Sequence, residues 1–298
     1  MLIVAALGGN ALLRRGEPLT AAAQRRNARI AARALAPIAA GHDLVVTHGN
    51  GPQVGLLAEV EDPADWPLDV IGAETEGMIG YVLEQELRAA LGGAEVATLL
   101  TQTVVDEADP AFGRPTKPIG AVYDAGRADE LRARGWTVAP DGRGVRRAVA
   151  SPEPREVLGV PAVRLLLGAG MVVVCAGGGG IPVVRAGGGL TGVEAVVDKD
   201  LAAAVLAQSL DADVLLLLTD VPGVYRDPSA AEPEVIGQAP PSYLRALDLA
   251  AGSMGPKAEA AARFAASGGR AAIGGLADAE ALLAGTAGTQ VSLRMSAG

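Results

Sequence analysis

The sequence predicts an α/β fold in which an open, mostly parallel sheet is sandwiched between helices and carries a projecting lid subdomain. Short apolar runs alternate with longer stretches rich in alanine, leucine, glutamate and arginine, which favour helices. Glycine-rich turns follow several of the apolar runs, as strand-to-helix turns do in such sheets. A proline-rich segment interrupts the alternation and predicts the lid.

The expected elements follow one another along the chain. The apolar runs predict strands at residues 2–7, 43–48, 96–102, 171–176, 213–219 and 270–275. The stretches of helical character predict helices at residues 21–40, 72–91, 162–169, 199–210, 242–251 and 257–267. The chain has 298 residues, half of them hydrophobic, which is enough for one large domain or two lobes that share one sheet.

The segment from Asp106 to Pro154 is rich in proline and charge and lacks the pattern of a long strand. We interpret residues 113–154 as a small subdomain that projects from the sheet, because a lysine lies in its PTKPIG turn. The alternative is a solvated surface loop without a role.

Composition and charge exclude several classes of protein. The chain has 34 acidic and 25 basic residues, and no basic block that would neutralise the phosphates of a nucleic acid. No run of eighteen apolar residues lacks glycine or charge, which argues against a membrane span. Residues 1–13 are interrupted by glycine and have no basic residues before them, so we interpret them as a strand and its turn. We expect a cytoplasmic protein.

Cysteine and histidine chemistry is not expected. Cys175 lies in an apolar run, where a small buried side chain is the simpler interpretation. His42 and His48 are the two histidines, too few for a histidine-based metal cage, and we expect no protein metal site. We interpret His48 as a structural residue at a strand end.

Lysine is the most informative residue type. Of the 25 basic residues only Lys117, Lys199 and Lys257 are lysines, and each lies beside a glycine-rich or acidic motif. An ammonium group is a slender point charge that can reach between phosphate oxygens, whereas a guanidinium requires planar, bidentate geometry. The three lysines therefore predict a phosphate site, although an arginine-biased composition could leave three lysines by chance.

Glycine-rich turns support the same prediction. Three predicted strands end in Gly8-Gly9-Asn10, Gly49-Asn50-Gly51 and residues 177–180, which are all glycine. Such turns let backbone N–H groups approach an anion closely at the carboxyl ends of parallel strands. Three of them at strand ends are stronger evidence than one.

Two further motifs follow buried runs. In residues 198–200, a lysine stands between two aspartates at a helix start, where its charge is unfavourable unless an anion or the carboxylates compensate. Thr219 and Asp220 follow a buried strand and are suited to holding a nucleotide, whose base or ribose Tyr225 could contact. A capped turn explains each of these residues equally well on its own.

The common nucleotide signatures are missing. Neither a GxxxxGK[ST] loop nor the HRD and DFG motifs of protein kinases occur. A GxGxxG match at Gly187, Gly189 and Gly192 does not open a helix, so it predicts a hairpin or mobile loop instead of a dinucleotide site.

The chain resembles the carbamate kinases, a branch of the amino acid kinase superfamily, nearly from end to end. The resemblance rests on ALGGNAL (6–12), THGNGPQVG (47–55), PTKPIG (115–120), DKDLAA (198–203) and GSMGPK (252–257), among other motifs. It implies reversible phosphoryl transfer between ATP and carbamate, giving ADP and carbamoyl phosphate, with Mg²⁺ carried by the nucleotide. It also implies a homodimer and a role in arginine metabolism.

The resemblance assigns roles to lobes and residues within one amino acid kinase-like domain, residues 1–298. Residues 1–170, including the subdomain, would bind the acceptor, and residues 171–298 the nucleotide. Lys199 and Lys257 would hold the ATP phosphates, Lys117 would reach the transferring group, and Asp200 would orient the lysines. The implied acceptor-binding residues are Gly8, Gly9, Asn10, Gly49, Asn50 and Gly51. The implied nucleotide-binding residues are Gly178, Gly179, Asp220, Val221, Tyr225, Met254 and Gly255.

Two other functions stay open. A sister kinase could act on an acylated amino acid or another small carboxylate, but neither ALGGNAL nor THGNGPQVG contains the arginine that a larger carboxylate would need. A nucleotide-binding regulator without turnover is the second alternative. The chain also departs from the family pattern, with charged residues at Glu74 and Glu76, and with Val145 and Ala150 where tryptophan and proline are common.

Overall fold

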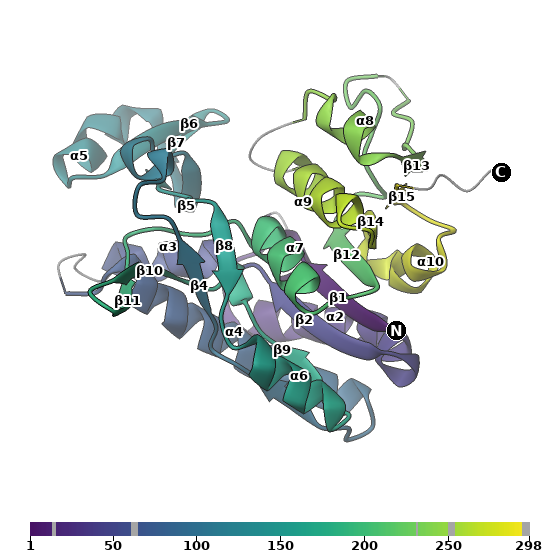
Figure 1. The fold of residues 1–298 in the computed structure, drawn as a ribbon. Coiled ribbons are helices and arrows are strands. Elements are labelled where there is room, and N and C mark those ends of the chain that lie inside the picture. The colour runs from purple at the N-terminus through teal and green to yellow at the C-terminus, as the bar shows by residue number, and fades with distance from the viewer. Residues whose placement is uncertain (14–15, 61–64, 231, 250–253, 294–298) are drawn as a thin grey trace.

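An eight-stranded sheet forms the centre of the computed structural model, which describes residues 1–13, 16–60, 65–230, 232–249 and 254–293 (Figure 1). The strand order is β13-β15-β14-β12-β1-β2-β9-β3, and every pairing except β14 with β15 is parallel. The strands are β1 (Leu2–Leu7), β2 (Asp43–His48), β3 (Val96–Thr98), β9 (Val172–Val174), β12 (Val214–Thr219), β13 (Gln238–Ala239), β14 (Arg270–Gly275) and β15 (Thr289–Val291).

Helices cover both faces of this sheet. The helices of the described ranges are α1 (Gly9–Leu12), α2 (Ala21–Gly41), α3 (Gly51–Val60), α4 (Leu68–Ala90), α5 (Ala128–Ala133), α6 (Val160–Gly168), α7 (Lys199–Ser209), α8 (Pro241–Arg245), α9 (Met254–Ala266) and α10 (Ala279–Ala284). Helix α5 lies away from this sheet, in the segment that projects from the body of the molecule (Figure 1). Because side chains alternate along a strand, Val4 and Ala6 of β1 pack with α6, α7, α8 and α9, whereas Ile3, Ala5 and Leu7 pack with α2, α4 and α10. The predicted sandwich of helices around a mostly parallel sheet is confirmed.

The predicted strand at residues 96–102 divides in two. Its first part is β3, and its end begins β4 (Gln102–Val105), which belongs to a second sheet of order β11-β10-β4-β8. The other strands of that sheet are β8 (Pro154–Val157), β10 (Ile181–Ala186) and β11 (Gly189–Gly192). β10 and β11 pair antiparallel around the GxGxxG segment, so the expected hairpin is confirmed. Strand β9 follows residue 170, the expected lobe boundary, yet pairs with β2 and β3 of the first half.

A third sheet forms the segment that projects from the body of the molecule (Figure 1). Its antiparallel strands are β5 (Lys117–Asp124), β6 (Thr137–Asp141) and β7 (Gly144–Val149), joined by α5. The expectation that this segment lacks a long strand was wrong, because β5 has eight residues. Most of β5 is partly or fully exposed, so its sequence lacks the continuous apolar pattern of a buried strand. None of the helices in the described ranges is both long and apolar enough to cross a membrane.

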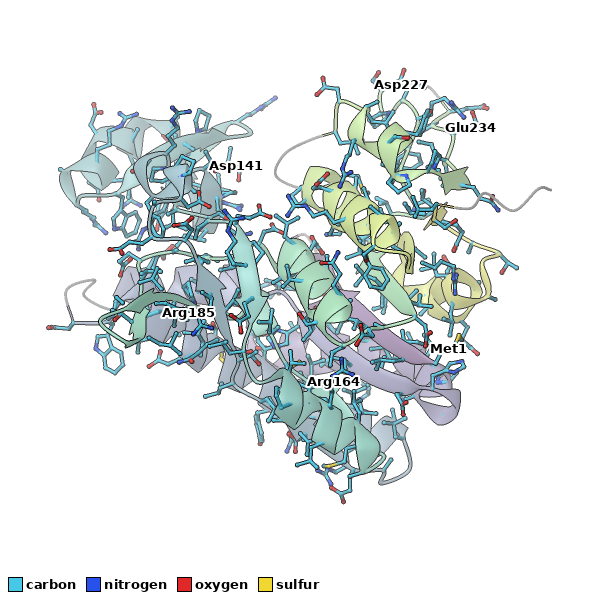
Figure 2. The ribbon with its side chains drawn as sticks, viewed as in Figure 1. Met1, Asp141, Arg164, Arg185, Asp227 and Glu234 are labelled. Carbon is cyan, nitrogen blue, oxygen red and sulfur yellow. The ribbon has the colours of Figure 1, made fainter. Side chains whose placement is uncertain are left out.

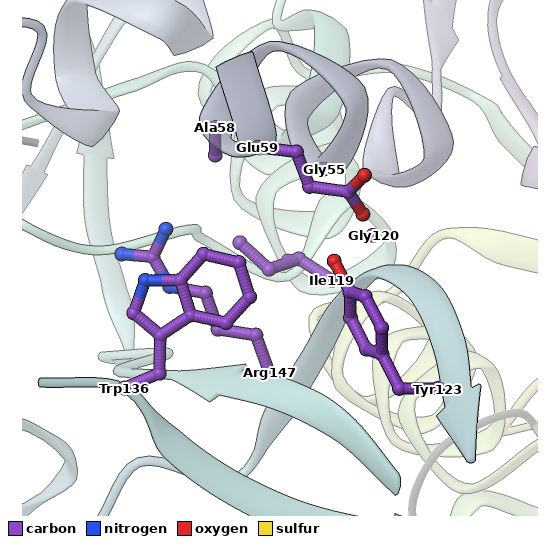
Figure 3. A pocket seen from close by; sticks show the side chains of 8 residues that line it. All are labelled: Gly55, Ala58, Glu59, Ile119, Gly120, Tyr123, Trp136 and Arg147. Carbon is purple, nitrogen blue, oxygen red and sulfur yellow. The ribbon is translucent and has the colours of Figure 1, made fainter. Parts of the chain in front are cut away.

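The projecting sheet is seated on α3 through two glycines. A Cβ on Gly55 of α3 would overlap the backbone of Gly120 in β5, and Gly120 itself has φ +75°. A small hollow lies beside this contact, lined by Gly55, Ala58, Glu59, Ile119, Gly120, Tyr123, Trp136 and Arg147 (Figure 3). The Ala121 N–H donates to Glu59 Oε1 at 3.4 Å, so a side chain of α3 also holds β5.

We predict that Gly55→Ala destabilises the protein, because the new methyl group meets backbone and not a movable side chain. The expected loss in the free energy of unfolding is about 1–3 kcal/mol, the usual cost of overpacking. Urea denaturation measures it. Gly72→Ala in α4 is the matched control: its Cβ meets nothing within 4 Å, and alanine should stabilise the helix by up to about 1 kcal/mol. Equal midpoints for the two variants would contradict this account of the junction.

Candidate active site

All three lysines converge on two aspartates at the start of α7. Lys117 Nζ lies 2.9 Å from Asp198 Oδ2. Lys199 Nζ lies 2.7 Å from Asp200 Oδ1, and Lys257 Nζ lies 2.9 Å from Asp200 Oδ2. The lysines come from β5, α7 and α9, so segments far apart in the sequence meet at one point.

This group of charges is largely shielded from water. Only 3% of Asp200 and 8% of Lys257 are exposed. Three ammonium groups face two carboxylates, and the N-terminus of α7 adds partial positive charge. Because burying an unbalanced charge is costly, a further anion would be stabilised here.

Two surface arginines show how the environment of arginine differs from that of the three lysines. Arg164 and Arg185, labelled in Figure 2, form exposed ion pairs with Asp211 and Glu156 on the surface. Exposed pairs of this kind contribute little to stability. The lysines thus occupy the site, as expected from their rarity in the sequence, while these arginines lie outside it.

The site controls the protonation of its members. Burial would raise the pKa of Asp200, but Lys199 and Lys257 outweigh it and hold that pKa below its usual value. Burial lowers the pKa of Lys199 to about 8, although Asp200 opposes the shift. For Lys257 burial also acts to lower the pKa, but Asp200 outweighs it and the pKa is raised. Lys199 therefore loses its proton more readily, and a bound anion would help to retain it.

Asp198 has a role that the sequence did not reveal. Its Oδ1 accepts the Asp200 and Leu201 N–H groups at 2.9 and 3.2 Å, so it caps α7 as an N-terminal aspartate commonly does. Its Oδ2 binds Lys117, and this lysine holds the pKa of Asp198 low against the effect of burial. The feature of the sequence that could have indicated this role is the acidic residue on each side of Lys199.

The first two glycine turns meet beside Lys199. A Cβ on Gly49 would lie 3.2 Å from both Gly9 Cα and Lys199 Cε. Gly8 lies against β12, with its N–H donating to Leu218 O at 2.9 Å. Asn10 is in the short helix α1 that follows, and Gly51 begins α3. The carboxyl ends of β1, β2 and β12 therefore come together, as predicted.

The third turn, residues 177–180, packs against the second. A Cβ on Gly178 would overlap the Asn50 side chain, and one on Gly177 would overlap the His48 ring. A Cβ on Gly179 would lie 2.8 Å from Val197 O, one residue before Asp198. Gly178 and Gly179 thus lie between the Asn50 turn and the start of α7.

His48 is buried and neutral. Burial lowers its pKa to about 4, and its Nδ1 lies 3.2 Å from Gly49 O. Of the described residues, no group of three or more histidine, cysteine, aspartate or glutamate side chains is arranged to hold a metal ion. The arrangement can therefore bind and orient anions, and it offers no protonated histidine near pH 7.

The remaining expected nucleotide residues lie at the carboxyl end of β12 and the start of α9. Asp220 and Val221 directly follow β12, and Tyr225 forms a bridge with Val235. Met254 and Gly255 form the first turn of α9, which carries Lys257. GSMGPK falls partly outside the described residues, since Gly252 and Ser253 are not among them.

We predict that Asp200→Asn destabilises the protein, because one carboxylate compensates two buried ammonium groups. Breaking a buried ion pair typically costs about 3–5 kcal/mol, which urea denaturation at pH 7 would reveal. Asp211→Asn is the control: this exposed aspartate pairs with Arg164, and asparagine tolerates its φ of 55°. A loss no larger than that of Asp211→Asn would contradict the compensation.

Comparisons with known proteins agree with this geometry. The model of the amino acid kinase family matches residues 1–274. Carbamate kinases of Rhizobium meliloti and Haemophilus influenzae are 52% and 50% identical, covering 99% and 98% of this chain and 94% and 97% of their own. Solved structures of Giardia lamblia carbamate kinase, bound to citric acid and to AMP-PNP, are 38% identical, with TM-scores of 0.89 and 0.87 and 98% of each chain covered. The chain belongs to the amino acid kinase family, in its carbamate kinase branch.

Proposed function

We propose that this protein catalyses reversible phosphoryl transfer between ATP and carbamate, giving ADP and carbamoyl phosphate. One observation carries the proposal: Lys117, Lys199 and Lys257 converge on Asp198 and Asp200. The turns of Gly9 and Gly49 pack against Lys199, so the backbone of both turns lies beside the lysines. The relatives from Rhizobium meliloti and Haemophilus influenzae are carbamate kinases, and they match the chain over almost its whole length.

Each lysine has its own task in the proposal. Lys199 and Lys257 hold the nucleotide phosphates, and Asp200 keeps both ammonium groups in place between turnovers. Lys117 acts on the transferring phosphoryl group, because it enters from the projecting sheet and pairs with the outer aspartate, Asp198. When the phosphates bind, their oxygens replace the aspartates as partners of the lysines.

The two substrates occupy opposite sides of the lysines. Carbamate binds at the turns of Gly8, Gly9, Asn10, Gly49, Asn50 and Gly51. The nucleotide extends over the β12 and α9 end of the site, with contributions from Asp220, Val221, Tyr225, Met254 and Gly255. Gly178 and Gly179 were expected on the nucleotide side, but we place them with the acceptor because a Cβ on Gly178 would overlap the Asn50 side chain. Support for this division comes from the packing of Gly9 and Gly49 against Lys199.

The proposed reaction requires no general base. Phosphoryl transfer depends mainly on positioning and on neutralising charge, and carbamate is already a nucleophile. A neutral, buried His48 fits this requirement. Mg²⁺ carried by the nucleotide would supply further neutralisation of the phosphate charge beside the three lysines. We place the enzyme in the cytoplasm.

The direct test is ATP formation from ADP and carbamoyl phosphate, followed with luciferase. We expect ATP only when both substrates and Mg²⁺ are present. Silence with carbamoyl phosphate together with ATP-dependent phosphorylation of an amino acid would identify a sister kinase. ATP binding without transfer to any acceptor would identify a regulator.

We predict that Lys117→Ala lowers kcat by about 100-fold or more, the cost of losing one group that stabilises a charged transition state. The KM for ADP should stay within about threefold, because the other two lysines still hold the phosphates. Steady-state kinetics separates these quantities. Arg114→Ala, which removes an exposed charge three residues away, is the control. A rise in the KM for ADP as large as the fall in kcat would argue against the role assigned to Lys117.

We also propose a homodimer, formed through the outer face of α4. Met78 and Tyr81 are 40% and 54% exposed, and Leu100, 61% exposed, lies beside Gly77 of the same helix. Strand β3 ends the eight-stranded sheet next to this surface, and open apolar edges favour association with a second copy. Size-exclusion chromatography with light scattering should show a dimer that Tyr81→Glu dissociates and Leu165→Glu, on α6, does not. A monomeric wild type would refute this.

A further inference from the structure

Glu76 is a buried carboxyl at a position where the resemblance to carbamate kinases predicts an uncharged polar residue. It lies on α4 and is 1% exposed. Its Oε1 accepts the Gly177 N–H at 2.8 Å, and its Oε2 accepts the Thr101 N–H at 3.1 Å. One side chain therefore joins the segment between β3 and β4 to the turn that follows β9.

The turn that Glu76 holds has a strained backbone. Ala176 has φ 50°, a left-handed conformation that costs a non-glycine residue about 1–2 kcal/mol. The Ala176 N–H donates to Thr101 Oγ1 at 3.0 Å, and Thr103 Oγ1 donates to Gly179 O at 2.8 Å. Side chains from α4 and the β3–β4 region thus maintain a conformation that the turn would not adopt by itself.

The strained turn is in direct contact with the acceptor residues. No space remains for a Cβ between Gly178 and the Asn50 amide, or between Gly177 and the His48 ring. A shift of the turn must therefore move Asn50 or leave a gap behind it.

Thr75, the neighbour of Glu76, holds the same asparagine from another direction. Asn50 Nδ2 donates to Thr75 Oγ1 at 3.0 Å. The Thr75 hydroxyl in turn donates to Ile71 O at 2.9 Å or to Gly72 O at 3.0 Å, which fixes its orientation in the helix. Both residues are buried, with Thr75 at 0% exposure.

We propose that Thr75 and Glu76 are the positioning residues of the acceptor site: Thr75 orients the Asn50 amide, and Glu76 fixes the glycine turn packed against it. The inference rests on the proposed function, because it assigns Asn50 to carbamate and carbamoyl phosphate. Neither residue touches the reacting atoms. Their effect should therefore appear in the binding of the acceptor and not in that of the nucleotide.

A carboxyl suits this task better than an amide does. Two N–H groups converge on Glu76 and each finds an oxygen, whereas glutamine would present its NH₂ group to one of them. Leaving a buried donor unpaired or opposed would loosen the turn, and we expect the affinity for the acceptor to fall by about 10-fold.

The charge state of Glu76 adds a pH dependence. Burial raises its pKa to about 8, against the opposing hydrogen bonds from Thr101 and Gly177. The titratable groups nearby are His48, neutral with a pKa of about 4, Cys175, whose thiol pKa is raised by burial, and Lys199, which acts on His48. Glu76 is therefore mostly protonated at pH 7. Ionisation above pH 8 places a buried negative charge behind the site for an anionic acceptor.

The kinetic test uses four variants: Glu76→Gln, Thr75→Ala, Thr75→Ser and, as the control, Glu74→Gln, an exposed glutamate of the same helix. Glu76→Gln and Thr75→Ala should raise the KM for carbamoyl phosphate by about 10-fold and leave the KM for ADP within about twofold. Thr75→Ser keeps the hydroxyl, so its KM for carbamoyl phosphate should stay at the wild-type value. An equal rise in both KM values, or no rise, overturns the assignment.

A pH profile distinguishes positioning by a carboxyl from general loss of packing. At each pH, the kcat/KM for carbamoyl phosphate of the wild type is divided by that of Glu76→Gln. The titrations of Lys199 and of the substrate occur in both proteins, so they cancel in this ratio. The ratio should fall as pH rises, with a midpoint near 8. A ratio that is flat from pH 6.5 to 9.5, values chosen to bracket that pKa by roughly 1.5 units each way, overturns the role of the carboxyl.

Thermal melts establish that each variant is folded. If Glu76→Gln does not fold, the two Thr75 variants decide the question, because an unchanged KM for carbamoyl phosphate in Thr75→Ala overturns the proposal. A wild type that is silent with carbamoyl phosphate refutes the proposed function itself. A wild type that is active, with variants that match it, refutes the positioning inference alone.

Discussion

The Asp200 carboxylate binds Lys199 through one oxygen and Lys257 through the other, and the arrangement of the site depends on this contact. Two ammonium groups cannot be buried side by side without an anion between them. Asp200 supplies that anion from the first turn of α7, whose cap, Asp198, also binds the third lysine. The start of a single helix thus sets the places of cations from α7, α9 and the projecting sheet.

The parallel sheet explains why such distant segments meet. Strands β1, β2, β9 and β12 point their carboxyl ends in one direction, so the turns after them share one edge. Helix α4 packs against this edge and holds it with two hydrogen bonds: Asn50 donates to Thr75, and the Gly177 N–H donates to Glu76. The close contact between Gly120 and Gly55 joins β5, the strand that carries Lys117, to α3. Helix α3 begins at Gly51, in the turn assigned to the acceptor.

The buried elements were predictable from sequence, and contacts between elements were not. Strands β1 and β2 and helix α2 were located within a residue, because continuous apolar runs and helix formers leave little choice. Strands β5, β6 and β7 were missed because most of their residues are partly or fully exposed, and because β5 and β6 contain prolines. The rarity of lysine identified Lys117, Lys199 and Lys257, but Asp198 looked like an ordinary cap. The hydrogen bonds of Glu76 depend on how α4 packs against two turns, which local pattern cannot reveal.

The most direct measurement uses the chain's three lysines as NMR reporters. Labelling lysine with ¹³C at Cε gives one signal for each of Lys117, Lys199 and Lys257, with no other lysine to overlap. A non-hydrolysable ATP analogue with Mg²⁺, added together with carbamate, should shift all three signals, whereas adenosine, which lacks phosphates, should shift none. If any of the three signals stays in place when the phosphates bind, the lysines do not form one phosphate site and the account is wrong.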